Sequence, residues 1–265
     1  MFGFGKRGRR AKLREATFPA EWAAILDANV PLFHRLPEGD REELRGLIQV
    51  FLAEKVFEGC GGLAITDEVR VTVAAQACLL LLRRDTDFFP KVVTVLVYPS
   101  AYVSDAPHRE PAGVVVEGPE ERLGEAWEAG VVVLSWDDVR RDSADLREGL
   151  NVVLHEFAHQ LDHEDGAADG TPILPGRGRL EAWSRVMGDE FDRLRRDDAL
   201  GRRSVLDPYG ATDPAEFFAV ATESFFLTPG PLAKKHPELY GQLKAYYAQD
   251  PARDHVAARP PRAGR

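Results

Sequence analysis

His155-Glu156-Phe157-Ala158-His159 is the stretch that decides how this chain is interpreted. On a helix, two histidines four residues apart lie one turn apart on the same face, where both imidazoles can hold one Zn²⁺. The glutamate between them, Glu156, then lies beside the metal without binding it and can take a proton from water. The flanking sequence also predicts a helix, because apolar residues recur there at three- and four-residue steps: Leu150, Val153, Leu154, Phe157 and Leu161.

A catalytic zinc site needs three protein ligands, so the motif predicts one more. His163 continues the four-residue spacing of the two histidines. However, eight residues of helix separate His163 from His155 by about 12 Å along the axis, which is too far for one ion to bridge. We therefore interpret His163 as part of the polar end of the helix, which stops at Gly166.

Two glutamates further along the chain are better candidates for the third ligand. Residues 213–226 are predicted to form a helix, because Asp213 suits the N-cap and Pro214 the first helical position. Glu216 and Glu223 are seven residues apart and share one face of this helix. Glu216 could bind the metal or satisfy a backbone N–H as a capping-box residue. Glu223 could bind the metal, accept a hydrogen bond from a ligand histidine or be a solvated charge, and the residues alone do not decide.

The composition is that of a globular protein, with 44% hydrophobic residues and a net charge of −9, which argues against nucleic-acid binding. No run approaches the 18 or so apolar residues of a membrane span, and residues 1–10 lack the apolar stretch of a signal peptide. We therefore expect a cytoplasmic protein without membrane contact. Cys60 and Cys78 have no ligand spacing to a partner and fit reduced thiols. Both ends are arginine-rich, so residues 1–16 are predicted to be a flexible basic arm and residues 252–265 a disordered basic tail.

Residues 17–251, between the two tails, are predicted to form a single α+β domain. Strands are expected at 92–97, 113–117 and 131–135, which are rich in β-branched residues. The expected helical segments are 19–36, 38–55, 67–84, 138–166, 180–196, 216–227 and 238–247. In this order the strands precede the zinc helix, and the helices with the third ligand follow it. This is the order of a zincin-like metallopeptidase domain with a small mixed sheet and several surrounding helices.

The sequence also resembles a known family. Residues 155–162, Tyr209 and residues 213–220 together are similar to the Mlc titration factor A family of bacterial zinc peptidases, and the similarity runs over about residues 18–251. This resemblance implies that Glu216 is the third zinc ligand and that Tyr209 stabilises the reacting carbonyl. The same tyrosine and glutamate spacing is similar to that in the catalytic domain of anthrax lethal factor, a more distant relative in fold. The resemblance further implies weak aminopeptidase activity on short peptides and a glucose-responsive transcriptional repressor as partner.

We therefore predict a zinc-dependent metallopeptidase that holds one Zn²⁺ per chain with His155, His159 and Glu216. Glu156 is expected to act as the general base, and the Tyr209 hydroxyl to stabilise the oxyanion. A tyrosine after Asp-Pro is also typical of a turn that packs on a helix start, so the role of Tyr209 depends on the resemblance. The alternative is a regulatory binding protein that sequesters a transcriptional repressor, with the zinc site secondary. A structural zinc site is a further alternative, but a buried Glu156 next to a closed site would serve no packing purpose. A core helix with two chance histidines does not explain why the tyrosine and glutamate segment also matches.

Overall fold

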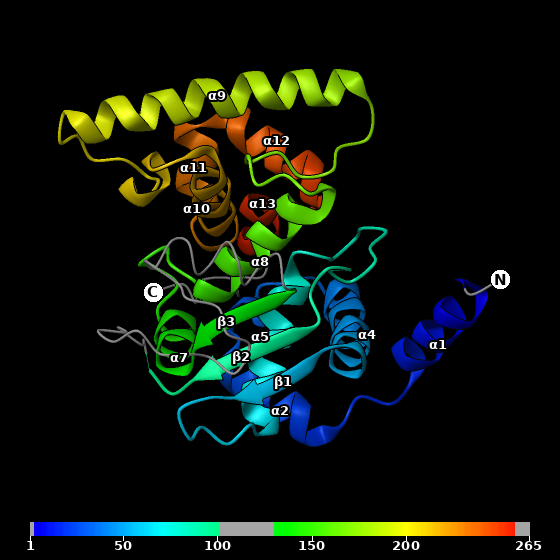
Figure 1. The fold of residues 1–265 in the computed structure, drawn as a ribbon. Helices are drawn as coiled ribbons and strands as arrows, with labels where there is room; N and C mark the ends of the chain where they lie inside the picture. Colours follow the sequence, from blue (N-terminus) through cyan, green and yellow to red (C-terminus); the bar gives the residue numbers. More distant parts are fainter. Residues whose placement is uncertain (1–2, 101–129, 258–265) are drawn as a thin grey trace, which may run out of the picture.

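The computed structural model describes residues 3–100 and 130–257 (Figure 1). In these ranges the chain is mostly helical with one small sheet, which agrees with the predicted α+β class. The α-helices are α1 (Gly3–Glu15), α2 (Ala20–Asn29), α3 (Pro31–His34), α4 (Glu38–Glu54), α5 (Asp67–Leu79), α7 (Trp136–Ala144), α8 (Val152–Asp162), α9 (Arg177–Ala199), α10 (Pro214–Leu227), α11 (Pro229–Lys235), α12 (Pro237–Tyr247) and α13 (Pro251–Ala257). The strands are β1 (Val56–Gly59), β2 (Thr94–Tyr98) and β3 (Val131–Ser135), and two 3-10 turns are η1 (His163–Asp165) and η2 (Pro208–Ala211).

The helix that carries the histidine motif lies between two parts of the molecule. Figure 1 shows the sheet in the lower half, with α4 and α5 close to it, and the long helix α9 across the upper end above α10, α11 and α12. Helix α8 lies between these halves and packs against α5 below and α10 above. Side chains from the two halves can therefore meet at α8.

The sheet is parallel throughout its described part, in the order β1-β2-β3, where we expected a mixed sheet. Helix α5 lies between β1 and β2 in the chain and provides the crossover that a parallel pair requires. Strands β2 and β3 alternate between fully and partly buried residues, and the fully buried ones are Val95, Val97, Val132 and Leu134. Strand β1 was not predicted, because its four residues are mainly exposed and show no such alternation. The strand expected at 113–117 lies outside the described residues.

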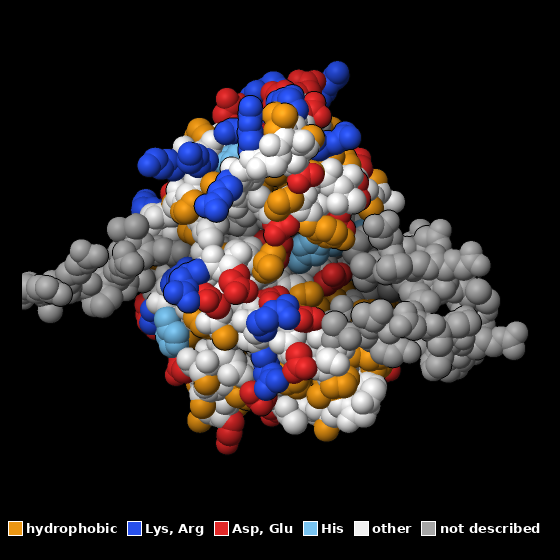
Figure 2. Space-filling model, turned by 90° about the vertical axis from the view of Figure 1, so that its left-hand side faces the viewer, with side chains coloured by type: hydrophobic (Ala, Val, Ile, Leu, Met, Phe, Trp, Pro, Cys, Tyr) orange, Lys and Arg blue, Asp and Glu red, His pale blue; other side chains and the backbone are white. Residues whose placement is uncertain are grey.

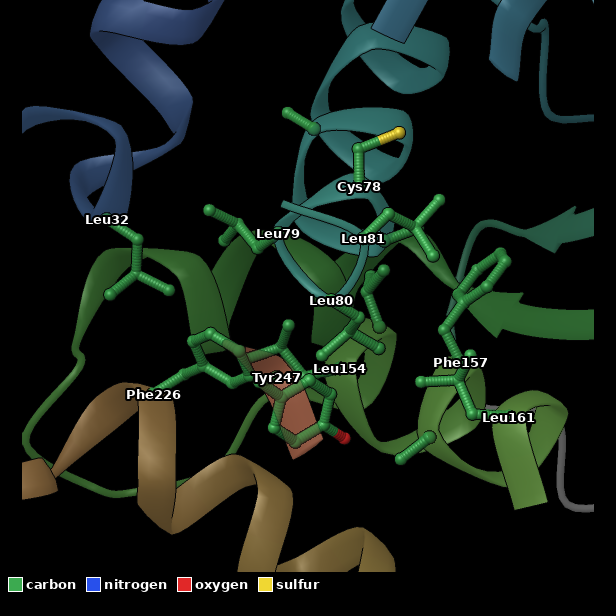
Figure 3. Packing of buried hydrophobic residues seen from close by; sticks show 14 of the residues in the cluster. Leu32, Cys78, Leu79, Leu80, Leu81, Leu154, Phe157, Leu161, Phe226 and Tyr247 are labelled. Atoms are coloured by element: carbon green, nitrogen blue, oxygen red, sulfur yellow. The ribbon is translucent and has the colours of Figure 1, made fainter. Parts of the chain in front are cut away.

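The apolar stripe of α8 packs into the core. Figure 3 shows its side chains beside leucines from the end of α5 and the residues that follow, which are likewise fully buried. The α8 residues in this contact region are Leu154, Phe157 and Leu161, and the facing leucines are Leu80 and Leu81. Packing at this density fixes the rotation of α8 about its axis, so the face with the two histidines is turned toward α10.

Several details of the predicted helices are wrong: the segment 19–36 is divided into α2 and α3, and the segment 138–166 is interrupted between Ala144 and Val152. Leu150, which we placed in the core-facing stripe, is 38% exposed because α8 begins only at Val152. The helix expected over 67–84 ends at Leu79, and the chain then turns, with Arg83 in the left-handed region at φ 59°. The guanidinium of Arg83 donates to both carboxylate oxygens of Asp40 on α4, at 2.9 and 2.7 Å, which holds this turn in place.

The N-terminal segment forms helix α1 where we expected a flexible basic arm. Arg10 donates to both carboxylate oxygens of Glu54 at 2.7 Å and to Asp87 at 2.6 Å. The hydrogen bond from Arg10 lowers the pKa of the Glu54 carboxyl below its ordinary value. Gln49 on α4 donates to two backbone carbonyls at the end of α1. The residues that bond to α1 in these contacts lie 33 to 77 residues away in the sequence. The basic composition of the segment therefore could not predict them.

Part of the expected C-terminal tail is also helical. Residues 252–257 belong to α13, which begins with Pro251, and Ala252 N donates to the hydroxyl of Tyr240 at 2.9 Å. Residues 258–265 lie outside the described part of the chain. Within the described ranges, no helix combines the length and apolar content needed to cross a membrane.

Candidate metal centre

The N-terminus of α8 is fixed by a buried hydrogen-bond network. Asn151 is its N-cap, and its Oδ1 accepts a hydrogen bond from Leu154 N at 2.9 Å. Its Nδ2 donates to Gln76 Oε1 on α5, and Asp142 of α7 accepts from Val152 N at 3.0 Å. Helices α5 and α7 therefore set where α8 begins, and through it where the histidines lie.

The C-terminus of α8 is held just as firmly. The chain leaves α8 through η1, which ends at Gly166 with φ 102°, a conformation that favours glycine. Lys91 Nζ donates to the backbone carbonyl of His163 at 2.6 Å, so a positive charge lies at the negative end of the helix. His163 is thus a turn residue beyond α8, as its spacing predicted, and it takes no part in the cluster described next.

His155, His159 and Glu216 converge at one point between α8 and α10. The two histidine Nε2 atoms are 3.2 Å apart. Glu216 Oε2 lies 3.0 Å from His155 Nε2, and Glu216 Oε1 lies 3.5 Å from His159 Nε2. Two ligands bound tetrahedrally to one Zn²⁺ at about 2.0–2.1 Å would be about 3.3 Å apart. One donor atom from each residue lies within 4.8 Å of the other two, so a single small metal ion could be bound by all three residues.

The cluster is buried on one side and open on the other. The side chain of His159 is 2% exposed, whereas those of His155 and Glu216 are 15% and 12% exposed. Figure 2 shows histidine side chains at the surface at mid-height of the molecule, framed by acidic and hydrophobic side chains. An ion held by these three residues could keep a position open for water or a substrate, as catalytic metal sites do.

The beginning of α10 explains why Glu216 is free to face the histidines. Asp213 caps the helix, and its Oδ1 accepts from Ala215 N at 2.8 Å and from Glu216 N at 2.9 Å. Pro214 occupies the first turn, where no N–H is needed. The carboxylate of Glu216 does not serve as the capping-box acceptor that we considered, because it bonds to His155 and His159 instead.

Glu223 lies on the opposite side of the His155 ring from Glu216. Its Oε2 is 3.1 Å from Nδ1 of His155, whereas Glu216 contacts Nε2 of the same ring. The two imidazole nitrogens point in different directions, so one ion cannot be shared by both glutamates through this histidine. The geometry therefore separates the two glutamates, which the sequence alone left open, and places Glu216 with the candidate ligands.

The charges of the cluster are strongly coupled. Burial opposes the charged form of His155, but hydrogen bonds with Glu216 and Glu223 outweigh it and raise the pKa of His155 to about 10. Burial likewise disfavours the ionised form of Glu216, but its bonds with His155 and His159 prevail and lower its pKa to about 2. Burial is the largest effect on Glu223 and raises its pKa. Both glutamates thus favour a proton on His155, and a metal ion bound at Nε2 would take the place of the proton that faces Glu216.

The two predicted catalytic residues lie next to the cluster. Glu156 is 8% exposed, and its charge is close enough to favour the protonated form of His155. The ring of Tyr209, on η2, has its centre 6.1 Å from that of His155, and the residue is 49% exposed. Its backbone is fixed, because Asp207 accepts from Tyr209 N at 2.8 Å and the Thr212 hydroxyl donates to Tyr209 O at 2.7 Å. Glu156 and Tyr209 therefore both lie close to His155.

The polar residues that support α8 are not among those predicted from the sequence. Asn151 carries a local signal, since an asparagine immediately before an apolar helical pattern is a typical N-cap. Gln76 and Asp142 carry no such signal, because their hydrogen-bond partners come from other helices.

The chain is similar to one protein family and to several known proteins. The family model described as glucose-regulated metallo-peptidase M90 matches residues 5–248. The uncharacterized protein slr2042 of Synechocystis is 40% identical over 245 residues, which cover 92% of this chain and 89% of the relative. The proteins named Mlc titration factor A of Serratia proteamaculans and Pectobacterium atrosepticum are 34% identical over 235 residues and 33% identical over 233 residues. These alignments cover 88% of both chains for the Serratia protein, and 87% of this chain and 86% of the relative for the Pectobacterium protein.

Proposed function

We propose, from the premise that this chain belongs to the glucose-regulated metallo-peptidase M90 family, that it is a zinc-dependent peptidase with aminopeptidase-like action on short peptides. The observation that carries the proposal is the convergence of donor atoms from His155, His159 and Glu216 within 4.8 Å of one another, with His155 and Glu216 partly exposed. Two imidazoles and one carboxylate, with one side open, are a donor set of catalytic zinc sites.

The residues around the cluster have separate roles in this proposal. His155, His159 and Glu216 hold the metal, which when bound would supply a Lewis acid and lower the pKa of water to about 7. Glu156 accepts a proton from the attacking water and delivers it to the amine that leaves. The Tyr209 hydroxyl donates a hydrogen bond to the carbonyl oxygen as negative charge develops on it. Tyr209 is half-exposed, and its ring lies beside that of His155, which supports this role.

The direct test is metal analysis combined with hydrolysis of aminoacyl chromogenic substrates. We expect one zinc per chain, activity that is lost on chelation, and recovery on addition of zinc. A metal-free protein, or hydrolysis that is insensitive to chelation, would contradict the metallopeptidase. Equal cleavage of peptides with blocked amino termini would contradict only the aminopeptidase-like preference.

The role of Tyr209 can be tested with Tyr209→Phe, which removes only the hydroxyl. We expect kcat to fall by about 10²–10³-fold, the effect of losing one oxyanion donor, while zinc content and thermal stability stay unchanged. Tyr240→Phe is a matched control, because the Tyr240 hydroxyl bonds to Asp250 away from the cluster. Wild-type turnover in Tyr209→Phe would leave its hydroxyl without a role in the reaction.

The names of the relatives favour a second proposal, in which this chain binds a transcriptional repressor and the metal site is secondary. The test is co-purification with a glucose-responsive repressor from the same organism, for the wild type and for Glu216→Ala. Binding that survives the loss of zinc would support this function, and no binding by either protein would contradict it.

A further inference from the structure

Glu223 links the ring of His155 to the N-terminus of the helix that carries it. The residue is 3% exposed and lies in the second half of α10. Its Oε2 accepts from His155 Nδ1 at 3.1 Å, and its Oε1 accepts from the backbone N of Asn151 at 2.6 Å. Burial of an ionised carboxylate costs free energy unless hydrogen bonds replace those to water. These two hydrogen bonds therefore stabilise the buried carboxylate of Glu223.

The bond to Nδ1 has a consequence for the other nitrogen of the ring. A neutral imidazole carries a proton on one nitrogen and a lone pair on the other. A carboxylate at Nδ1 can only accept, so it keeps the proton there and leaves the lone pair on Nε2. In His155, Nε2 is the atom that faces His159 and Glu216. Glu223 thus selects the form of His155 that can bind a metal at the cluster.

We infer that Glu223 is a positioning residue: it fixes the ring and tautomer of His155 and ties them to the start of α8, without touching the metal. This inference rests on the proposed zinc site and names a residue on which its metal affinity depends. The second oxygen of the carboxylate accepts from a backbone N–H, so this anchor does not depend on the side chain of Asn151. Glu223 therefore ties the His155 ring both to α10 and to the start of the helix that carries the ring.

The decisive variant is Glu223→Gln, which keeps the shape of the side chain. The glutamine side chain has only one oxygen, so it can accept a hydrogen bond either from His155 Nδ1 or from the backbone N of Asn151. Its NH₂ group then faces the remaining N–H, which loses its acceptor. We expect the zinc affinity, measured by competition with a chromophoric chelator, to fall about 10–100-fold, as for other partners of metal ligands. The protein should remain folded, which its thermal midpoint and circular dichroism would show.

A matched control separates positioning of the ring from general support of α8. Asn151→Ala removes the N-cap side chain but leaves the backbone N of residue 151 and the ring of His155 untouched. We expect it to lower the midpoint temperature of thermal unfolding, because the helix loses its cap, and to change zinc affinity by less than about threefold. An equal loss of affinity in both variants would show that the helix end, not the ring contact, sets the affinity, and would overturn the inference.

The tautomer can be measured without any variant, by long-range ¹H–¹⁵N correlation spectra of the zinc-loaded wild type. We expect His155 to keep its proton on Nδ1, and a proton on Nε2 would overturn the inference even if Glu223→Gln did not fold. Unchanged zinc affinity in a folded Glu223→Gln would overturn it too, while leaving the zinc site intact. A wild type that binds no zinc would remove the proposed metal centre together with this inference.

Discussion

Replacing Glu156 with glutamine is expected to leave zinc binding unchanged and to reduce kcat for peptide hydrolysis by on the order of 10²–10⁴-fold. Glutamine has the shape of glutamate, but its amide cannot accept a proton from water at neutral pH. The effect should be confined to turnover because the metal-binding atoms belong to His155, His159 and Glu216. Zinc stoichiometry and steady-state kinetics on the same preparation are the measurements.

Glu164→Gln is the matched control for this variant. Glu164 lies in η1, just beyond the end of α8, and is outside the cluster, so the same change of charge should leave kcat within about twofold of the wild type. Near-normal hydrolysis by Glu156→Gln would rule out Glu156 as the base. Loss of zinc from Glu156→Gln would instead show that this residue supports the metal.

The position of the site on two helices could be predicted from the sequence, because each helix carries complete local signals. The motif helix has its apolar stripe, and α10 has Asp213 and Pro214 at its start. Such signals depend only on residues within a few turns of one another. The cluster residues come from these two helices, and Tyr209 comes from η2, which precedes α10.

The choice between Glu216 and Glu223 could not be made from the residues in the same way. A spacing of seven places both on one face of α10, and local sequence does not say where that face meets α8. What separates them is the nitrogen of His155 that each one approaches, and this depends on how α8 and α10 cross. The resemblance to a known family supplied the choice of Glu216, and the geometry supports it independently.

Long-range contacts explain the other differences. Helix α1 was expected to be flexible because its composition is basic and polar, but Arg10 finds acidic partners on α4 and in the turn before β2. Strand β1 has four mainly exposed residues, so only its pairing with β2 identifies it. In both cases the stabilising partner is distant in sequence, where periodicity and capping signals carry no information.

Removal of the third ligand should have the largest effect on metal binding. In Glu216→Ala, two histidines remain, and we expect zinc affinity to fall by at least about 100-fold, more than for loss of a partner that only orients a ligand. Zinc at 1,000 times its Kd stabilises the folded wild type by about 4 kcal/mol, and a 100-fold weaker site would retain only about 1.4 kcal/mol at the same concentration. Thermal unfolding with and without zinc measures this difference directly.

Asp213→Asn is the control for Glu216→Ala, because asparagine caps a helix as well as aspartate does. It should preserve the start of α10 and keep the zinc-dependent rise in unfolding temperature, so a loss seen only in Glu216→Ala can be assigned to the ligand. A Glu216→Ala protein with full zinc affinity would require another carboxylate to complete the site. Glu223 cannot be that carboxylate unless α10 rotates, since its oxygen lies at Nδ1 of His155 and not at Nε2. Comparison of Glu216→Ala with Glu223→Gln therefore distinguishes a residue that binds the metal from one that orients its ligand.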